Sequence, residues 1–161
     1  MSDSWYDTAQ ICLNGHTANS MSVFLPQSNK KFCDECGAPT ITTCQSCNTP
    51  IKGYYHIPGV FGPCHYSPPS FCHNCGKPYP WLEAKLRAAQ ELSDELDTLT
   101  TNEKDILKKS LDDIIRNTPQ TPVAATRFKK LIAKAGPETA KAFKDILINV
   151  LSEFAKKTIW P

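Results

Sequence analysis

The sequence has no apolar segment long enough to cross a bilayer. Its longest apolar stretch, residues 146–151, is interrupted by Asn149 and is far shorter than the roughly 20 residues that a membrane helix needs. The first ten residues are polar, and no apolar signal region follows them. We therefore expect a cytoplasmic protein without a membrane span. In that reducing compartment cysteines persist as thiols or as metal ligands.

The sequence also lacks the short motifs that mark common enzyme classes. It contains no phosphate-binding loop, no G-x-S-x-G nucleophile turn and no H-E-x-x-H metalloprotease motif. One nucleophile candidate remains, Cys64 beside His65, but catalytic cysteine–histidine pairs are usually distant in sequence. We expect no enzyme activity, and a thiol-dependent enzyme using Cys64 is the alternative interpretation.

Cysteine and histidine are absent from the second half of the chain. All eight cysteines, all four histidines and nine of the thirteen prolines lie within residues 1–80, and the remainder has the apolar spacing of helices. Such a change in composition is typical of a domain boundary. The sequence predicts a metal-binding region at residues 1–79 and a helical domain at residues 80–161.

Three of the cysteine-containing segments repeat one pattern: C-x-x-C, then Gly or Asn, then any residue, then Pro. The segments are Cys33-Asp-Glu-Cys36-Gly-Ala-Pro, Cys44-Gln-Ser-Cys47-Asn-Thr-Pro and Cys72-His-Asn-Cys75-Gly-Lys-Pro. In such a turn the residue after the second cysteine is often forced to positive φ, which Gly tolerates at no cost and Asn tolerates next best. The repeat predicts three tight turns that each present two thiolates to one metal ion.

A fourth pair of ligands precedes the repeat. Cys12 and His16 are separated by Leu-Asn-Gly, and the Asn-Gly step favours a tight turn that brings both side chains to one point. Four half-sites of two ligands supply two structural Zn²⁺ ions with four protein ligands each. The predicted ligands are Cys12, His16, Cys33, Cys36, Cys44, Cys47, Cys72 and Cys75. A disulfide framework or an iron–sulfur cluster fits the spacing and the histidine less well.

The four half-sites can be combined in different ways. Sequential pairing, which we favour, makes one zinc ribbon of about residues 8–42 and a second of about residues 43–79. Residues 21–25 and 51–57 then supply a short strand in each ribbon. A cross-brace pairing stays open, because the entropy of loop closure discriminates only weakly between them. Replacement of a predicted ligand by Cys64, His56 or His65 also stays open.

The order of these motifs resembles one known family. ICLNGH, CDECG, CQSC and FCHNCGKPYPW, followed by a charged helix and the basic stretch ATRFKKLIAKAG, are similar to an uncharacterised bacterial family of tandem zinc-ribbon proteins, a domain of unknown function. The resemblance covers most of the chain. It implies zinc ribbons and a bacterial or phage origin, and it implies no activity.

The second half has the periodicity of amphipathic helices. We expect four helices, at residues 80–97, 100–116, 121–135 and 137–158, the second of them capped by Thr100. The expected fold class is therefore small α+β: two tandem zinc ribbons, short hairpins held by metal, followed by three to four amphipathic helices. The wide apolar stripe of helix 137–158 is typical of a bundle core, and homo-oligomerisation through it is the alternative.

Charge is distributed unevenly along the chain. Residues 1–80 carry four basic and four acidic side chains, whereas residues 117–161 carry eight basic and three acidic ones. A candidate binding surface consists of Arg127, Lys129, Lys130, Lys134, Lys141 and Lys144, and a solvated helix face is the alternative interpretation of these residues. Bound thiolates would make the ribbon region negative, which suits phosphate binding poorly. We expect an adaptor or regulatory module that binds a protein partner, with nucleic-acid binding through residues 127–144 as the alternative.

Overall fold

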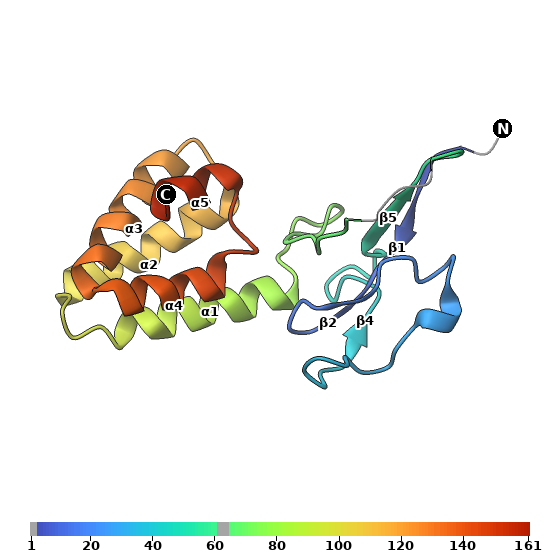
Figure 1. Cartoon of the computed structure of the whole chain (residues 1–161), viewed down its shortest axis with the longest axis horizontal. Coiled ribbons are helices and arrows are strands. Elements are labelled where there is room, and N and C mark those ends of the chain that lie inside the picture. The colour runs from blue at the N-terminus through green and yellow to red at the C-terminus, as the bar shows by residue number, and fades with distance from the viewer. Residues whose placement is uncertain (1–2, 61–64) are drawn as a thin grey trace. The chain divides into compact units, whose positions relative to one another are not determined.

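A computed structural model describes residues 3–60 and 65–161. The chain forms two compact units that divide between Glu83 and Ala84. Short strands and long connecting segments make up the first unit, and helices make up the second (Figure 1). The expected small α+β fold class, with two cysteine-rich groups in the first part and helices in the second, is confirmed.

Two small antiparallel sheets build the first unit. Strands β1 (Trp5–Thr8) and β5 (Lys52–His56) form a two-stranded ribbon, in which Trp5 lies opposite His56 and Tyr6 opposite Tyr55. The second sheet has the order β3-β2-β4, with β2 (Gln10–Cys12) between β3 (Thr17–Asn19) and β4 (Thr40–Ile41). Strand β1, which precedes the first cysteine, therefore pairs with β5, a strand of the expected second ribbon, whereas β2, β3 and β4 all come from the first.

The strand expected at residues 21–25 is wrong. These residues form a turn that leads into a short 3₁₀ helix, η1 (Pro26–Ser28). The cause is Asp7, whose carboxylate accepts hydrogen bonds from the backbone N–H groups of Val23 (3.0 Å) and Phe24 (3.3 Å). The strand expected at residues 51–57 is confirmed as β5.

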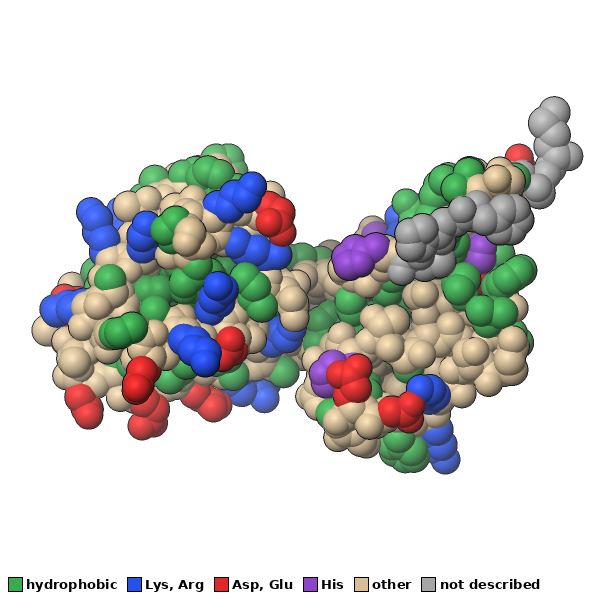
Figure 2. Space-filling model, viewed as in Figure 1, with side chains coloured by type: hydrophobic (Ala, Val, Ile, Leu, Met, Phe, Trp, Pro, Cys, Tyr) green, Lys and Arg blue, Asp and Glu red, His purple; other side chains and the backbone are tan. Residues whose placement is uncertain are grey.

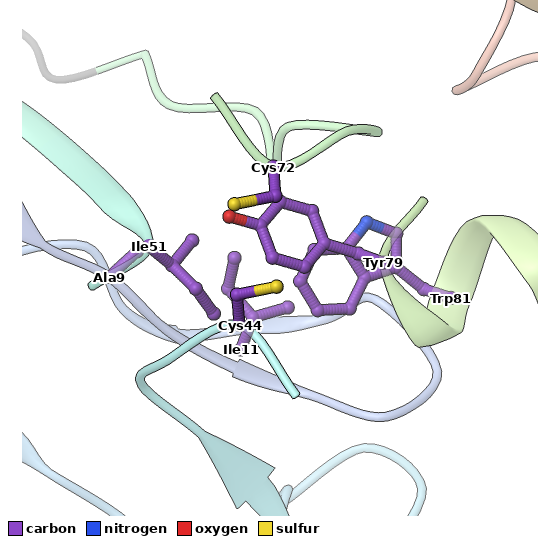
Figure 3. Close-up of a cluster of buried hydrophobic side chains, with 7 residues drawn as sticks. All are labelled: Ala9, Ile11, Cys44, Ile51, Cys72, Tyr79 and Trp81. Carbon is purple, nitrogen blue, oxygen red and sulfur yellow. The ribbon is translucent and has the colours of Figure 1, made fainter. Parts of the chain in front are cut away.

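The core of the first unit is small and includes two cysteines. Its fully or almost fully buried members are Ala9, Ile11, Cys44, Ile51, Cys72, Tyr79 and Trp81 (Figure 3). Tyr79 stacks on Trp81 with 4.7 Å between ring centroids, and the Trp81 indole N–H donates to the Pro69 carbonyl at 2.9 Å. So few apolar residues stabilise a unit of this size only slightly.

Gly53, in β5, lies where three backbone segments meet. A Cβ atom there would lie 2.3 Å from the Ser20 carbonyl oxygen and 2.9 Å from the Ala9 nitrogen. Backbone atoms cannot move away as a flexible side chain can, so we expect Gly53→Ala to destabilise the first unit by about 3 kcal/mol or more. Urea unfolding followed by fluorescence measures the loss.

Gly59 is the matched control for this substitution. It has a φ of 75°, but a Cβ atom there would meet nothing within 4 Å. Gly59→Ala should therefore lose only the conformational cost of about 1–2 kcal/mol. Equal losses for the two variants would show that the close approach at Gly53 is not rigid.

Five helices form the second part of the described chain. They are α1 (Pro80–Asp94), α2 (Thr101–Arg116), α3 (Thr121–Ala135), α4 (Pro137–Leu147) and α5 (Glu153–Ile159). Helix α3 is central to the bundle and packs against α2, α4 and α5 (Figure 1). The buried side chains of these four helices include Leu107, Leu111, Ile114, Phe128, Ile132, Phe143, Leu147 and Ile159. None of the described helices has the length and apolar character that a bilayer crossing requires.

The single helix expected at residues 137–158 is wrong, because the chain breaks between α4 and α5. Ser152 begins the new helix, and its hydroxyl accepts a hydrogen bond from the Ala155 N–H at 3.2 Å. After the break α5 lies against α3, and the Trp160 indole N–H donates to the Ala140 carbonyl at 3.2 Å. The apolar stripe is thereby divided between two helices of the same bundle.

Thr100 caps α2 as the sequence predicts. Its hydroxyl accepts from the Glu103 N–H at 3.2 Å, while the Glu103 carboxylate accepts from the Thr100 N–H at 2.8 Å. We expect Thr100→Ala to lower the stability of the helical unit by about 1 kcal/mol. Thermal unfolding by circular dichroism measures this, and Thr101→Ala, one residue into the helix, is the control that should change stability little. Equal effects would contradict a capping role.

Candidate metal centres

The first group of donors forms where β2 ends. Gly15, with a φ of 91°, closes a turn in which its N–H donates to the Cys12 carbonyl at 2.9 Å. The turn carries His16 back beside Cys12, and the His16 N–H donates to the Cys12 sulfur at 3.3 Å. Cys33 and Cys36 approach from the first C-x-x-C turn, so that all four donor atoms lie within 4.8 Å of one another.

The three C-x-x-C turns have one backbone conformation. The residues after the second cysteine, Gly37, Asn48 and Gly76, have φ values of 72°, 59° and 72°, which confirms the predicted positive φ. In each turn the N–H of this residue donates at 2.9 Å to the carbonyl of the first cysteine. The turns at Asn48 and Gly76 face each other and bring Cys44, Cys47, Cys72 and Cys75 within 4.8 Å.

The separations between donors fit a tetrahedral ion. Zinc bonds of about 2.3 Å to sulfur and 2.0 Å to nitrogen place two sulfurs about 3.8 Å apart, and a sulfur and a nitrogen about 3.6 Å apart. The sulfur pairs Cys12–Cys36, Cys44–Cys75 and Cys47–Cys72 are each 3.7 Å apart. His16 Nδ1 lies 3.5 Å from the Cys12 sulfur and 3.6 Å from the Cys33 sulfur. A disulfide would need about 2.0 Å, and every described cysteine is a free thiol.

Polar groups around the sulfurs stabilise their charged form. The Asn14 amide donates to the Cys36 sulfur at 3.3 Å, and Asn74 donates to the Cys47 sulfur at 3.7 Å. The pKa of Cys36 falls to about 6 through backbone donation at Ala38 and through Asn14. The pKa of Cys47 falls to about 6 through its contacts with Thr49 and then Asn74. Thiolates are the form that binds metal, so these donors prepare Cys36 and Cys47 for it, whereas burial raises the pKa of Cys12.

An acid from the first C-x-x-C turn lies near His16. Its Nδ1 faces the sulfurs, while its Nε2 lies 3.6 Å from a carboxylate oxygen of Glu35. A carboxylate that accepts a hydrogen bond from the far nitrogen of a ligating imidazole fixes the ring, and Glu35 lies within reach of that position after a small side-chain movement. Glu35 was not singled out in the sequence, although its place between Cys33 and Cys36 was the available signal.

The two groups share a pattern of burial. In each, the first cysteine of both half-sites is buried, and the last cysteine, Cys36 or Cys75, is exposed. The second group also belongs to the core, because Cys44 and Cys72 pack among the side chains of Figure 3. There the buried Tyr79 hydroxyl points at the Cys72 sulfur and has no nitrogen or oxygen partner among the described residues. Burial, followed by the nearby Cys72, raises the pKa of Tyr79, so its O–H stays available as a donor to a thiolate.

All eight predicted ligands converge in the sequential grouping and not in the cross-brace one. His56 lies outside both groups, because its Nε2 bonds to the Asp7 carboxylate at 2.9 Å. His65 and His73 are exposed, and neither belongs to a donor group. Cys64 lies outside the described residues. The two alternatives that make it a catalytic thiol or a replacement ligand therefore also concern residues outside the described part of the chain.

The predicted basic surface lies on α3 and α4. All six of its side chains, Arg127, Lys129, Lys130, Lys134, Lys141 and Lys144, are exposed. Lys134 forms an ion pair with Glu103 of α2 at 2.6 Å, which also lowers the pKa of Glu103. This lysine therefore already has an anionic partner within the bundle.

One comparison with known proteins gives a match. The model of a family described as "uncharacterized protein conserved in bacteria (DUF2321)" matches residues 5–159, nearly the whole chain. No curated protein and no solved structure matches the chain significantly.

Proposed function

Since the chain belongs to this uncharacterised bacterial family, as its motifs indicate, we propose that it is a zinc-stabilised interaction module. Two structural Zn²⁺ ions hold the first unit in shape, one bound by Cys12, His16, Cys33 and Cys36 and the other by the four remaining predicted cysteines. The module acts in the cytoplasm as an adaptor or regulatory component that binds another protein, and it has no catalytic role.

The observation that carries this proposal is the completeness of the two donor sets. Each set has four donors at tetrahedral separations, and three or four of them are thiolates, which suit zinc. Four protein ligands leave no position for a water or a substrate, which is the arrangement of structural zinc sites. Thiolate ligands persist in a reducing compartment, which suits the proposed cytoplasmic location.

Metal analysis tests the zinc sites. We expect two zinc ions per chain after purification without chelator, and we expect Co²⁺ substitution to give the intense visible absorption of four-coordinate thiolate sites. His16→Ala should weaken one site and leave the other. One metal per chain, iron in place of zinc, or a six-coordinate cobalt spectrum would contradict the proposal.

The interaction role needs a separate experiment in cells. Chemical crosslinking followed by mass spectrometry should recover a partner crosslinked to the intact chain and lost with a Cys44→Ser variant. A Lys129→Glu/Lys130→Glu variant is the control and should keep that partner. Salt-dependent retention on DNA or RNA that this control variant abolishes would contradict the protein-binding assignment and favour the basic stretch.

A further inference from the structure

Large exposed apolar side chains concentrate in the first unit. Trp5, Tyr6, Val23, Phe24, Phe32, Tyr55, Ile57 and Val60 belong to it, whereas the helical unit exposes Ile106, Val123 and Phe154. Apolar side chains are visible on the surface of the first unit in Figure 2. We define the aromatic face as Trp5, Val23, Phe24 and His56, which come from β1, the turn after β3, and β5.

The three rings of the aromatic face form one continuous surface. The His56 ring stacks on Trp5 with 4.3 Å between centroids and an interplanar angle of 19°, and it contacts the Phe24 ring at 5.2 Å. Val23 and Phe24 are each 62% exposed, and Trp5 is 41% exposed. Because an aromatic side chain has 150–250 Å² to bury, these residues leave roughly 300 Å² of apolar surface in contact with water. Patches of that size on soluble monomers are often functional.

A buried carboxylate holds this face in place. The Asp7 side chain is fully buried and accepts from the N–H groups of Thr8 (2.7 Å), Val23 and Phe24, and it bonds to His56 Nε2. Burying a charge is costly unless every oxygen finds a partner. Here the partners are the backbone and imidazole groups that position the exposed rings. Rings fixed before contact lose little entropy on binding, as is typical of interaction surfaces.

The chemistry of the face favours a second copy of the same chain. Residues 4–8, 21–25 and 53–57 contain no lysine or arginine, and their one acid, Asp7, is buried and bonded to His56. In a two-fold contact each patch meets itself, so any net charge on it would repel its own copy. A neutral aromatic patch avoids that repulsion. Nucleic acid would need cations among the aromatics. The one lysine of β5, Lys52, lies 4.8 Å from the centroid of the Tyr6 ring, which is not part of the aromatic face.

We propose that the aromatic face is a homodimer contact, in which Trp5, Val23 and Phe24 of two copies pack across a two-fold axis. The contact rests on the proposed function in one respect: it requires the zinc-loaded fold that holds β1, β5 and the turn at residues 21–25 together. The patch is smaller than the roughly 800 Å² that each partner buries in a standard interface, so a rim of neighbouring residues must contribute. A dissociation constant on the order of 10 μM is expected for such a contact.

Sedimentation equilibrium of the zinc-loaded full chain tests this proposal. Phe24→Ser removes an exposed ring but keeps the N–H that binds Asp7, and Val23→Ser is a second, milder variant at the same face. Each should weaken dimerisation, Phe24→Ser at least tenfold. Phe154→Ser is the matched control, because Phe154 is 53% exposed on α5, within the stretch for which the sequence suggested helical oligomerisation. It should leave the dimer unchanged.

Zinc content, measured on every variant, separates the two proposals. Variants that keep two zinc ions and become monomeric support the aromatic face, whereas loss of zinc would count against the metal sites instead. Raising the salt concentration should maintain or strengthen the dimer, because no charges attract across the face. Three results would overturn the proposal: a wild-type monomer up to about 1 mM, a dimer broken by Phe154→Ser but not by Phe24→Ser or Val23→Ser, or a monomer whose oligonucleotide binding needs Phe24.

Discussion

Removal of zinc from the intact chain is expected to unfold the first unit and to leave helices α2 to α5 folded. The reason is the small core of the first unit, whose seven buried members include two of the proposed ligands, Cys44 and Cys72. Structural zinc sites contribute about 10–16 kcal/mol of apparent binding free energy. So small a core cannot replace that contribution. The helical unit has its own core around Phe128 and Phe143 and needs no metal.

Hydrogen exchange followed by mass spectrometry distinguishes the two units within one sample. After complete chelation, peptides from residues 3–60 and 65–79 should exchange freely, whereas peptides from residues 101–159 should keep their protection. Added zinc should restore the first set. A chelator already saturated with zinc is the control and should change nothing. Retained protection in the first unit, with metal analysis showing no zinc, would be incompatible with metal-dependent folding.

The local features of this fold depend on residues that are only a few positions apart in the sequence. The positive φ of Asn48 depends only on the turn that follows two cysteines three residues apart, and the capping box at Thr100 depends on a residue three positions later. Both were therefore predictable. The helices with clear periodicity, such as Thr121–Ala135, were predictable for the same reason.

Strand pairing in the first unit depends on contacts distant in the sequence. Strand β1 has four residues, too few for a clear alternation, and its partner β5 lies more than forty positions away. Asp7 gives no local signal of its burial, yet it converts residues 21–25 from an expected strand into a turn. The break before Ser152 was hidden because apolar spacing continues through Leu151 and Phe154. One missed signal was present: an asparagine follows the first cysteine by two positions at both Asn14 and Asn74.

Cys72→Ser is expected to remove one zinc ion and to unfold the whole first unit, because this residue serves the metal site and the core together. Its side chain is 2% exposed and packs with Ile11, Ile51 and Tyr79. The substitution would bury a serine hydroxyl in apolar surroundings and leave the other three thiolates without their ion. Cys36→Ser should be milder, because Cys36 is exposed and its group lies outside that core cluster. It should remove one zinc ion while the second group keeps its own.

Metal content and hydrogen exchange, measured on the same preparations, check this difference. Cys72→Ser should have at most one zinc ion per chain and lose exchange protection throughout residues 3–60. Cys36→Ser should have one zinc ion and keep protection around Ile51 and Tyr79. Cys64→Ser is the control and should keep two zinc ions, because both donor sets are complete without this residue. A different result would contradict this donor set: Cys64→Ser loses a zinc ion while Cys36→Ser retains two. Cys64 would then replace Cys36 as the fourth ligand of the first set, beside Cys12, His16 and Cys33.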